Sequence, residues 1–397
     1  MTDAVNLSPE IIQKESQYVL GTYPRAPFVF EKGEGMYVYD SDGKAYLDFG
    51  SGIAVNALGH NDPDVVASIQ EQAAQLSHVC NLYHTVPHVE LAEMLCNLSF
   101  ADKVFFSNSG AEAVEAALKF ARKYALKTSG PGKSGIVAFE DGFHGRTYGA
   151  LSVTAREKYQ APFRPLVPGV TIAPFNDIAA ARQLIGPDIC AVIVEPMQGE
   201  GGIHVATPEF LTSLREQCDQ VGALLIFDEI QCGMGRTGKL WAYEHYGVKP
   251  DMMTLAKALG GGLPIGATLL TDAVAAVIEP GDHGSTFGGG PVVCRAAQVV
   301  LEKISDPEIL AHVVEMGAYL AEKLLAIDTP HIQEIRMSGL MVGVEMDFDV
   351  RPLLGKGYAE GLLLLNAGTN VLRLLPPLIV EKEHIDACVA ALEAILD

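Results

Sequence analysis

The segment Gly222–Gly266, GALLIFDEIQCGMGRTGKLWAYEHYGVKPDMMTLAKALGGGLPIG, carries the pattern that decides the fold. It contains two short apolar runs, Ala223–Phe227 and Met252–Leu255, and a charged residue follows each of them: Asp228 the first, Lys257 the second. Short apolar runs bounded by polar turns are typical of strands that are buried on both faces of a parallel sheet. We therefore expect Asp228 and Lys257 at the carboxyl ends of two such strands, where ligands bind in open α/β sheets.

This carboxylate and lysine need a function, because a buried ion pair is a poor source of stability. Pyridoxal phosphate (PLP) would supply one, since a lysine can bond to its aldehyde while a carboxylate keeps its ring nitrogen protonated. A surface ion pair explains most Asp–Lys pairs equally well. The predicted position of both residues at strand ends is what favours the cofactor.

Composition limits the class of protein. The chain has 397 residues, of which 49% are hydrophobic, so it can form a large core and two domains. No apolar run is long enough for a membrane span, and the formal net charge of −21 argues against non-specific binding to nucleic acid. Seven scattered cysteines without a C-x-x-C motif, and no signal-peptide pattern in Met1–Glu10, predict a reducing, cytoplasmic location.

The order of elements predicts an α/β fold with three parts. Strand and helix patterns alternate between about residues 100 and 270, which indicates a mostly parallel sheet of at least five strands flanked by helices. Aromatic, β-prone pieces around the turn Asp40–Gly43 predict a small antiparallel sheet. We expect an N-terminal segment (1–60) that packs with the small domain, a large cofactor-binding domain (61–290) and a C-terminal small α+β domain (291–397).

The stretch Phe105–Glu112 predicts a strand that leads directly into a helix. Free N–H groups at a helix N-terminus bind phosphate, Gly110 and Ala111 permit a close approach, and Ser109 adds a hydroxyl. Ser109-x-x-Glu112 also fits an ordinary capping box. The residues alone leave both interpretations open.

Two further stretches offer groups for a ligand. In Phe143-His-Gly-Arg146 the aromatic ring can stack on a pyridine ring and the arginine can bind a carboxylate, although a polar surface loop is an equal alternative. Glu195 and Glu200 follow a predicted buried strand, and with Arg373 they suggest the polar edge of a site. Solvated loop charges would explain the two glutamates as well.

Two attractive motifs are discounted. Gly233-x-Gly235-x-x-Gly238 matches a dinucleotide fingerprint, but Asp228 would bring negative charge near a pyrophosphate and no clean helix follows. His84 and His88 are spaced for a metal, yet no Glu or Cys completes a set, so we predict no metal site.

Taken together, these motifs resemble those of the class III PLP-dependent aminotransferases over nearly the whole chain. The matching stretches are Ser107-Asn-Ser-Gly-Ala-Glu-Ala113, Phe143-His-Gly-Arg-Thr147, Glu195-Pro-Met-Gln-Gly-Glu-Gly201, Asp228-Glu-Ile-Gln231 and Ala256-Lys-Ala258. Within the class, Gly52–His60, Ala206–Phe210, Gln231–Gly238 and Leu365–Gly368 are most similar to the bacterial acetylornithine aminotransferases. The resemblance implies PLP-dependent transferase fold type I and a homodimer whose active sites are shared between subunits.

The resemblance also implies roles for individual residues. Lys257 would bond to PLP and later carry a proton, and Asp228 would pair with the ring nitrogen. Glu200 would neutralise Arg373 whenever no substrate carboxylate does so. The other cofactor-binding residues would be Ser109, Gly110, Ala111, Phe143, Gln231 and Thr286, the last reaching the partner subunit's phosphate, and the other substrate-binding residues would be Tyr23, Arg146, Ser285 and Arg373.

The implied reaction is reversible transamination between N-acetylornithine and 2-oxoglutarate, as in arginine biosynthesis. Ornithine aminotransferases place a tyrosine near the position of Ile53, so its absence argues against free ornithine as the preferred substrate. Another ω-aminotransferase, acting on succinylornithine or 4-aminobutyrate, is the main alternative. A PLP aminomutase or decarboxylase, a binding module and an NAD enzyme are less favoured.

Overall fold

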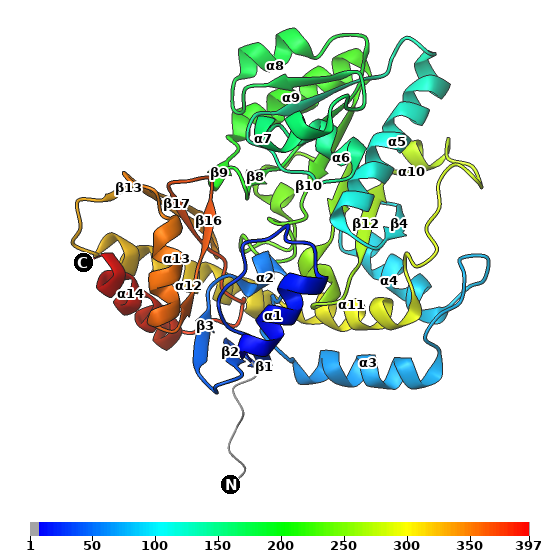
Figure 1. The fold of residues 1–397 in the computed structure, drawn as a ribbon. Helices are drawn as coiled ribbons and strands as arrows, with labels where there is room; N and C mark the ends of the chain where they lie inside the picture. Colours follow the sequence, from blue (N-terminus) through cyan, green and yellow to red (C-terminus); the bar gives the residue numbers. More distant parts are fainter. Residues whose placement is uncertain (1–7, 397) are drawn as a thin grey trace.

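The computed structural model of the protein describes residues 8–396. The expectations for Met1–Glu10 and for the beginning of the 1–60 segment fall partly on residues 1–7, which lie outside the described residues. Figure 1 shows a large α/β unit in the upper right, a smaller unit in the lower left, and the N-terminal sheet below and between them. Within residues 8–396, no helix is long and apolar enough to cross a membrane.

The large unit is built on a seven-stranded sheet. Its spatial order is β4 (Lys103–Ser107), β12 (Gly266–Leu270), β11 (Met252–Leu255), β10 (Leu224–Asp228), β7 (Ile189–Val194), β5 (Gly135–Phe139) and β6 (Val170–Ala173). Only β12 runs antiparallel to its neighbours. This confirms the prediction of a mostly parallel sheet with at least five strands.

Helices cover both faces of this sheet, which explains why its strands read as continuous apolar runs. Helix α5 (Gly110–Ser129) lies against one face and contacts β12, β11 and β7, with α6 (Tyr148–Val153) beside it. Helices α9 (Pro208–Val221) and α8 (Ile178–Leu184) cover the other face. Strand β10 shows the alternation, since Leu224 and Ile226 belong to the apolar cluster around α5 and Leu225 and Phe227 to the cluster around α9.

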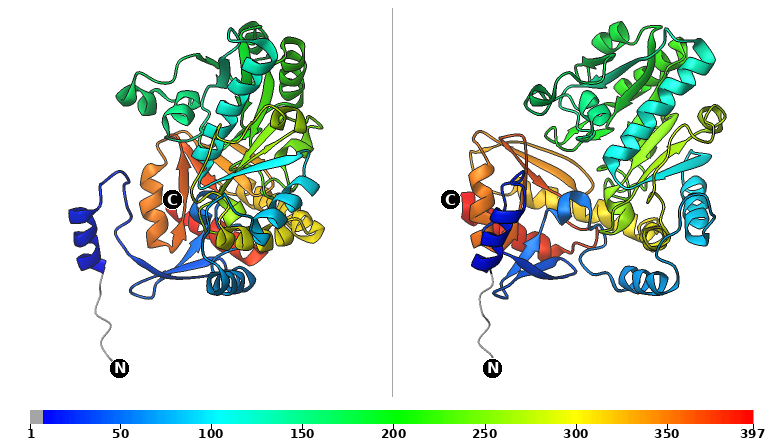
Figure 2. Two further views of the ribbon diagram at one scale, coloured as in Figure 1. Left: turned by 90° about the vertical axis from the view of Figure 1, so that its right-hand side faces the viewer. Right: turned by 45° about the vertical axis from the view of Figure 1, so that its right-hand side comes forward.

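The N-terminal sheet joins segments that are far apart in the sequence. Strands β1 (Phe30–Glu34), β2 (Tyr37–Asp40) and β3 (Ala45–Asp48) form an antiparallel meander, and β15 (Leu362–Leu363) pairs parallel to β3. The predicted antiparallel sheet and its turn at Asp40–Gly43 are therefore present. Ahead of it, α1 (Ser8–Tyr18) stands apart from the body, as the left view of Figure 2 shows.

A short turn, α2 (Ser51–Ala54), follows this sheet. All four of its residues have positive φ angles, from 42° to 65°, so it winds with the left hand. L-residues pay a steric penalty in this conformation and rarely adopt it consecutively. The turn is held by Asp48, whose Oδ1 accepts from the Gly50 and Ser51 N–H groups, and by the Ser51 hydroxyl, which donates to the Leu375 carbonyl at 2.6 Å.

The small unit contains a second antiparallel sheet with helices packed against it. The sheet has the order β13 (Ile332–Ser338), β14 (Met341–Met346), β17 (Val371–Leu374) and β16 (Leu365–Ala367). Its helices are α12 (Pro307–Leu325), α13 (Arg351–Ala359) and α14 (Lys382–Leu396).

The remaining elements lie within the large unit or between it and its neighbours. They are α3 (Pro63–Gln75), α4 (Val86–Asn97), α7 (Glu157–Gln160), η1 (Ala161–Phe163), β8 (Met197–Gln198), β9 (His204–Val205), η2 (Ala242–His245), η3 (Lys257–Gly260), α10 (Asp272–Ala275) and α11 (Pro291–Ile304). Helix α11 contacts α3, α4 and η3 as well as α12, so the predicted boundary at residue 290 falls beside a helix that touches both units. The three-part division stays a proposal.

Candidate active site

The ends of β10 and β11 bring the predicted carboxylate and lysine to one edge of the large sheet. The two strands pair in parallel, with Asp228 opposite Thr254, and Lys257 follows three residues later at the start of η3. Lys257 has a φ of 44°, in the left-handed region that costs non-glycine residues free energy. Such strain is common where a side chain must be aimed into a site.

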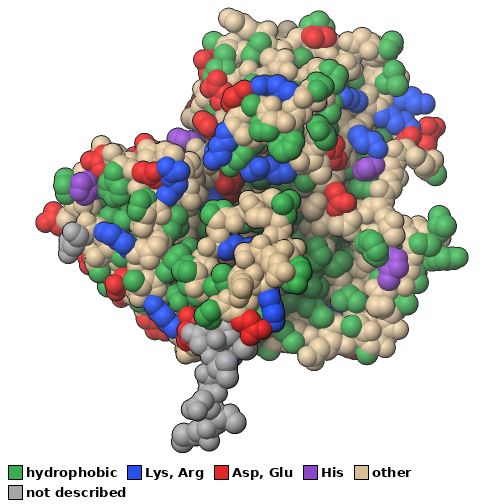
Figure 3. Space-filling view, viewed as in Figure 1, with side chains coloured by type: hydrophobic (Ala, Val, Ile, Leu, Met, Phe, Trp, Pro, Cys, Tyr) green, Lys and Arg blue, Asp and Glu red, His purple; other side chains and the backbone are tan. Residues whose placement is uncertain are grey.

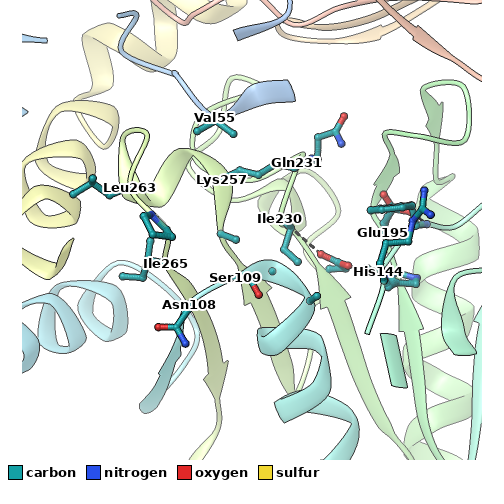
Figure 4. Close-up of a pocket in the computed structure, with 18 of the residues that line it drawn as sticks. Val55, Asn108, Ser109, His144, Glu195, Ile230, Gln231, Lys257, Leu263 and Ile265 are labelled. Carbon is teal, nitrogen blue, oxygen red and sulfur yellow. Dashed lines mark hydrogen bonds and ion pairs between the residues drawn. The ribbon is translucent and has the colours of Figure 1, made fainter. Parts of the chain in front are cut away.

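A cavity of about 510 Å³ opens at this edge of the sheet. Its walls include Ser109, Gly110, Ala111, Phe143, Arg146, Asp228, Gln231 and Lys257, together with His144, Glu195, Asn108, Val55 and the segment 262–265. Figure 4 shows Lys257 and Gln231 on one side of this space, Ser109 at the start of α5 on another, and His144 near Glu195. Eight predicted site residues, from four separate stretches of sequence, thus line one space.

Asp228 is held by three donors at the floor of the cavity. Its Oδ1 accepts from the Thr254 hydroxyl (3.0 Å) and the Ile230 N–H (3.1 Å), and its Oδ2 lies 2.7 Å from Nδ1 of His144. Burial lowers the pKa of His144, but the hydrogen bond and charge of Asp228 outweigh it and raise this pKa above its usual value. The sequence motif assigns His144 no role, and its contact with Asp228 is a feature of the site that only the structure shows.

Lys257 is prepared for nucleophilic chemistry. Burial, and secondarily the positive charge of Arg373, lower the pKa of its ammonium group to about 8. A lysine with a lowered pKa has more of its neutral, nucleophilic form near neutral pH. The cavity therefore holds an activated amine close to a buried carboxylate.

The N-terminus of α5 has the predicted cap, and phosphate binding there stays a prediction. The Ser109 Oγ accepts from the Glu112 N–H at 3.2 Å, so a cap is present. The first N–H groups of a helix, here those of Gly110 and Ala111, have no acceptor within the helix, and both residues line the cavity. The Glu112 carboxylate accepts from the Asn108 N–H and the Ser109 hydroxyl, which ties the loop before the helix.

Phe143 and Arg146 form another wall. The Phe143 N–H donates to Oε2 of Glu195 at 2.9 Å, which fixes the loop that carries the ring. Arg146 is exposed, and its guanidinium carbon lies 3.4 Å from the centre of the Tyr159 ring and 5.5 Å from that of Phe143. Tyr159, which sequence reasoning did not select, thus braces the arginine.

A cluster of Glu200, Gln231 and Arg373 lies beside the cavity. Nη1 of Arg373, on β17, donates to Oε1 of Glu200 at 2.5 Å and to Oε1 of Gln231 at 3.1 Å. Arg373 is only 2% exposed, and its Nε is buried without a partner among the described residues. Although burial opposes ionisation, the charge of Arg373 keeps the pKa of Glu200 below its usual value, so this is an ion pair at neutral pH.

Gly199 makes room for this cluster. A side chain there would overlap the Gln231 amide, so the amide lies flat against the glycine backbone. Because arginine only donates, the Gln231 oxygen must face Arg373 and its NH₂ group must point elsewhere.

Besides Glu200 and Arg373, four further residues singled out from the sequence lie outside the main cavity. Ser285 and Thr286 line a neighbouring cavity of about 730 Å³, together with His84 and His88. Tyr23 is 72% exposed and lines neither cavity, while Ile53 borders a third cavity of about 340 Å³. The face in Figure 3 is hollowed in its lower half, and hydrophobic side chains gather inside the hollow.

Comparison with known proteins places this geometry in a family. The family model described as aminotransferase class-III matches residues 21–396. The chain belongs to the class III aminotransferases. This aminotransferase is 51% identical over 387 residues to the mitochondrial acetylornithine aminotransferase of Alnus glutinosa, covering 96% of this chain and 86% of that protein.

Solved structures agree with the assignment. The N-acetylornithine aminotransferase of Stenotrophomonas maltophilia K279a superposes with a TM-score of 0.84 at 39% identity, over 97% of this aminotransferase and 98% of that chain. The ornithine aminotransferase of Toxoplasma gondii, in a structure described as having partial occupancy of PLP at its active site, gives a TM-score of 0.94 at 33% identity, over 98% and 94%. The predicted fold class and enzyme class are thereby confirmed.

Proposed function

We propose that this aminotransferase transfers the δ-amino group of N-acetylornithine to 2-oxoglutarate, giving N-acetylglutamate 5-semialdehyde and glutamate, with PLP as the cofactor. The reverse direction serves arginine biosynthesis. The choice of substrate follows the acetylornithine aminotransferases reported above, to which the chain is similar. The Glu200–Arg373 pair beside the cavity is the observation that carries the proposal.

The residues around the cavity fit PLP. An activated lysine suits an aldehyde, a buried carboxylate suits a protonated ring nitrogen, and free N–H groups at the start of α5 suit a phosphate. Gly145 supports the last contact, because its φ of 129° and its close approach to Ala111 leave no room for a side chain. When bound, PLP supplies the electron sink that stabilises negative charge on the substrate carbon.

Each residue has a task in this scheme. Nζ of Lys257 would hold the cofactor covalently, and the same amine would carry the proton to and from the amine-bearing carbon of the substrate. Asp228, held by His144 and Thr254, keeps the ring nitrogen protonated. Phe143 would stack on the cofactor's ring, and the Gln231 NH₂, which faces away from Arg373, would be free to donate to its phenolic oxygen.

The Glu200–Arg373 pair solves the problem of binding two unlike substrates at one place. Glutamate carries a carboxylate on its reacting carbon, whereas N-acetylornithine carries only hydrogens there. An uncompensated buried arginine would disfavour the second substrate by roughly 3–5 kcal/mol. Glu200 removes that penalty when N-acetylornithine is bound, and a glutamate carboxylate displaces it from Arg373.

The far end of the substrate needs its own cation. Arg146, exposed at the cavity wall and braced by Tyr159, is placed to bind the distant carboxylate bidentately. We assign Tyr23 and Ser285 to the substrate entrance. Neither lines the main cavity of the single chain, so these two assignments depend on the assembly.

We further propose a homodimer with shared active sites that works in the cytoplasm. Leu82 and Tyr83, 87% and 68% exposed, line the second cavity beside Ser285 and Thr286. Contact with a second subunit would cover these apolar side chains and bring Thr286 to the partner's phosphate. All seven cysteines are free, as suits a reducing compartment.

Half-reaction kinetics tests the proposal. In single turnovers, Glu200→Gln should slow the N-acetylornithine half-reaction by roughly tenfold or more while the glutamate half-reaction changes little. Equal losses in both halves would rule out the exchange of partners at Arg373. Lys257→Ala should bind added PLP without the absorption of the lysine-bound cofactor, and a normal band would refute the lysine assignment.

A second candidate is transamination of another ω-amine, such as succinylornithine or 4-aminobutyrate. The exposed position of Arg146 favours it, because an open cavity end places little limit on the acyl group. Values of kcat/KM across these amines decide between the candidates. A higher value for succinylornithine or 4-aminobutyrate than for N-acetylornithine would overturn our first choice.

A further inference from the structure

Glu200 lies in the tight connection of a β-hairpin. Strands β8 and β9 pair at its base, with Met197 opposite Val205 and Gln198 opposite His204, so residues 199–203 form the tip. The Gln198 amide also donates to the Glu140 carbonyl at 2.7 Å. The backbone of Glu200 is therefore fixed, and only its side chain is free to leave Arg373.

Two arginines, one from each unit, donate hydrogen bonds to backbone carbonyl groups at the tip of this hairpin. Nε of Arg336, on β13 of the small unit, donates to the Gly202 carbonyl at 3.0 Å. Nη2 of Arg156, in the segment between α6 and α7 of the large unit, donates to the Glu200 carbonyl at 2.5 Å and to the Asp141 carbonyl at 3.3 Å.

The two arginines differ in whether a carboxylate pairs with their positive charge. Arg336 forms ion pairs with Glu334 and Glu345. For Arg156 the structure gives only backbone acceptors, and its Nε is buried without a partner among the described residues. Arg156 thus presents an unused donor and an uncompensated charge next to the residue that carries the exchangeable carboxylate.

When a substrate carboxylate replaces Glu200 at Arg373, the displaced Glu200 carboxylate needs another cation nearby. The Glu200 side chain is only 25% exposed, so its carboxylate does not simply move into bulk water when a substrate carboxylate takes Arg373. A displaced, partly buried carboxylate requires another cation or it opposes substrate binding. The positive charges that act on Glu200 are those of Arg373, Lys257 and Arg156. During the glutamate half-reaction the first is occupied and the second is at the reaction centre.

We propose that Arg156 is a positioning residue that receives the Glu200 carboxylate when a dicarboxylate substrate binds to Arg373. A change of side-chain rotamer moves Glu200 from one guanidinium to the other while its backbone stays held by Arg156 itself. The inference rests on the proposed function, since it assumes that Glu200 leaves Arg373 in one half-reaction. Arg156 then helps the enzyme to accept 2-oxoglutarate and glutamate without touching them.

A double-mutant cycle of Arg156→Gln and Glu200→Gln tests this. In an otherwise native holoenzyme, Arg156→Gln should weaken the apparent affinity for 2-oxoglutarate and glutamate roughly tenfold to a hundredfold, as expected for losing a hydrogen bond to a charged group. The N-acetylornithine half-reaction should stay within about twofold. In the Glu200→Gln background the effect of Arg156→Gln should fall to about twofold or less, because no carboxylate remains to be moved.

This cycle separates the possible failures. If Glu200→Gln slows both half-reactions equally, the exchange at Arg373 that belongs to the proposed function fails, and the present inference fails with it. If Glu200→Gln discriminates but Arg156→Gln weakens 2-oxoglutarate binding equally in both backgrounds, only the present inference fails, because Arg156 then acts through the Glu200 backbone. Arg336→Gln is the matched control, since it loosens the same hairpin without removing an unpaired charge, and it should affect both half-reactions alike.

Binding of an unreactive dicarboxylate gives a readout that is independent of turnover. Glutarate, titrated calorimetrically into the holoenzymes, should bind about tenfold or more weakly to Arg156→Gln, and Arg156→Lys should restore part of the affinity because it keeps the charge but loses the planar fork. A crystal structure with glutarate should show the Glu200 carboxylate hydrogen-bonded to Arg156. A Glu200 carboxylate that stays on Arg373, or that turns to solvent or to Lys257, overturns the inference.

Discussion

The imidazole of His144 lies 2.7 Å from the carboxylate of Asp228, and the two side chains are 1% and 2% exposed. Desolvation on this scale would make either group costly alone. Held together, they form a charged or strongly polarised pair whose carboxylate stays available to a protonated ring nitrogen. His144, which also lines the cavity, therefore holds the Asp228 carboxylate that we assign to the cofactor's ring nitrogen.

Loss of the His144 donor should weaken cofactor binding. Removing one partner of a buried hydrogen bond to a charged group costs about 1.5–3 kcal/mol, so His144→Leu should lower PLP affinity roughly tenfold to a hundredfold. His144→Asn keeps an N–H near the position of Nδ1 and should recover part of that loss. Fluorescence titration of the cofactor-free proteins with PLP measures both, and equal affinities for the two variants would contradict the role of the donor.

Covalent capture of PLP by Lys257 should depend on pH around 8. Burial lowers the pKa of this lysine to about 8, so the neutral amine forms as pH rises through that value, well below the usual range for lysine. The rate of the absorbance change after mixing cofactor-free protein with PLP should rise with pH and level off above about 8. A rate that continues to climb toward pH 10 would show that the lysine is not perturbed.

Glu195 should make stability depend on pH. Burial raises the pKa of this carboxyl group to about 7, although it accepts from the N–H groups of Phe143 and Gly199. The folded state then holds a proton that the unfolded state releases between about pH 4.5 and 7, so this group lowers stability as pH rises through that window. Compared with Glu195→Gln, the native protein should lose on the order of 1–3 kcal/mol of unfolding free energy between pH 5 and pH 8.

Urea unfolding at fixed protein concentration checks this difference. Glu71→Gln, at an exposed position, serves as the control and should follow the native protein at both pH values. A constant gap between the native protein and Glu195→Gln across this range would show that the carboxyl group is ionised throughout.

The left-handed turn at Ser51–Ala54 should reveal its strain through Ile53. This β-branched residue has a φ of 65° and is 38% exposed. Ile53→Ala and Ile53→Gly remove the same contacts, but only glycine removes the steric penalty, so the glycine variant should be more stable by about 1 kcal/mol. Thermal unfolding of the two variants decides this, and a less stable glycine variant would mean that the turn is not strained.

Local sequence patterns predicted much of the fold. Several elements begin and end at clear local signals in the sequence, among them Met252–Leu255, Pro208–Val221, Pro291–Ile304 and Val371–Leu374. These segments carry strong signals: apolar runs between turn residues for the strands, and proline at the first helical position for the helices. The Ser51–Ala54 turn was missed because consecutive left-handed residues have no local signature outside glycine.

The candidate site also contains some residues that local sequence patterns could locate and some contacts that depend on packing. Asp228 and Lys257 could be placed from strand ends, but His144 could not be linked to Asp228, 84 residues away, because hydrogen bonding over that distance depends on packing. No motif or pattern in the sequence pointed to Arg156 as a functional residue. The role of every predicted site residue remains a prediction, and the single chain does not bring Ser285, Thr286 or Tyr23 into the main cavity.

The sequence by itself determined that Asp228 and Lys257 stand at the carboxyl ends of buried strands, because alternation of apolar runs and turns is a local property. The segment Gly222–Gly266 thus defined the chemistry. Only the tertiary structure decided which groups are desolvated and which charges face each other. The lowered pKa of Lys257, the Glu200–Arg373 pair and the unused donor of Arg156 all arise where distant segments exclude water together.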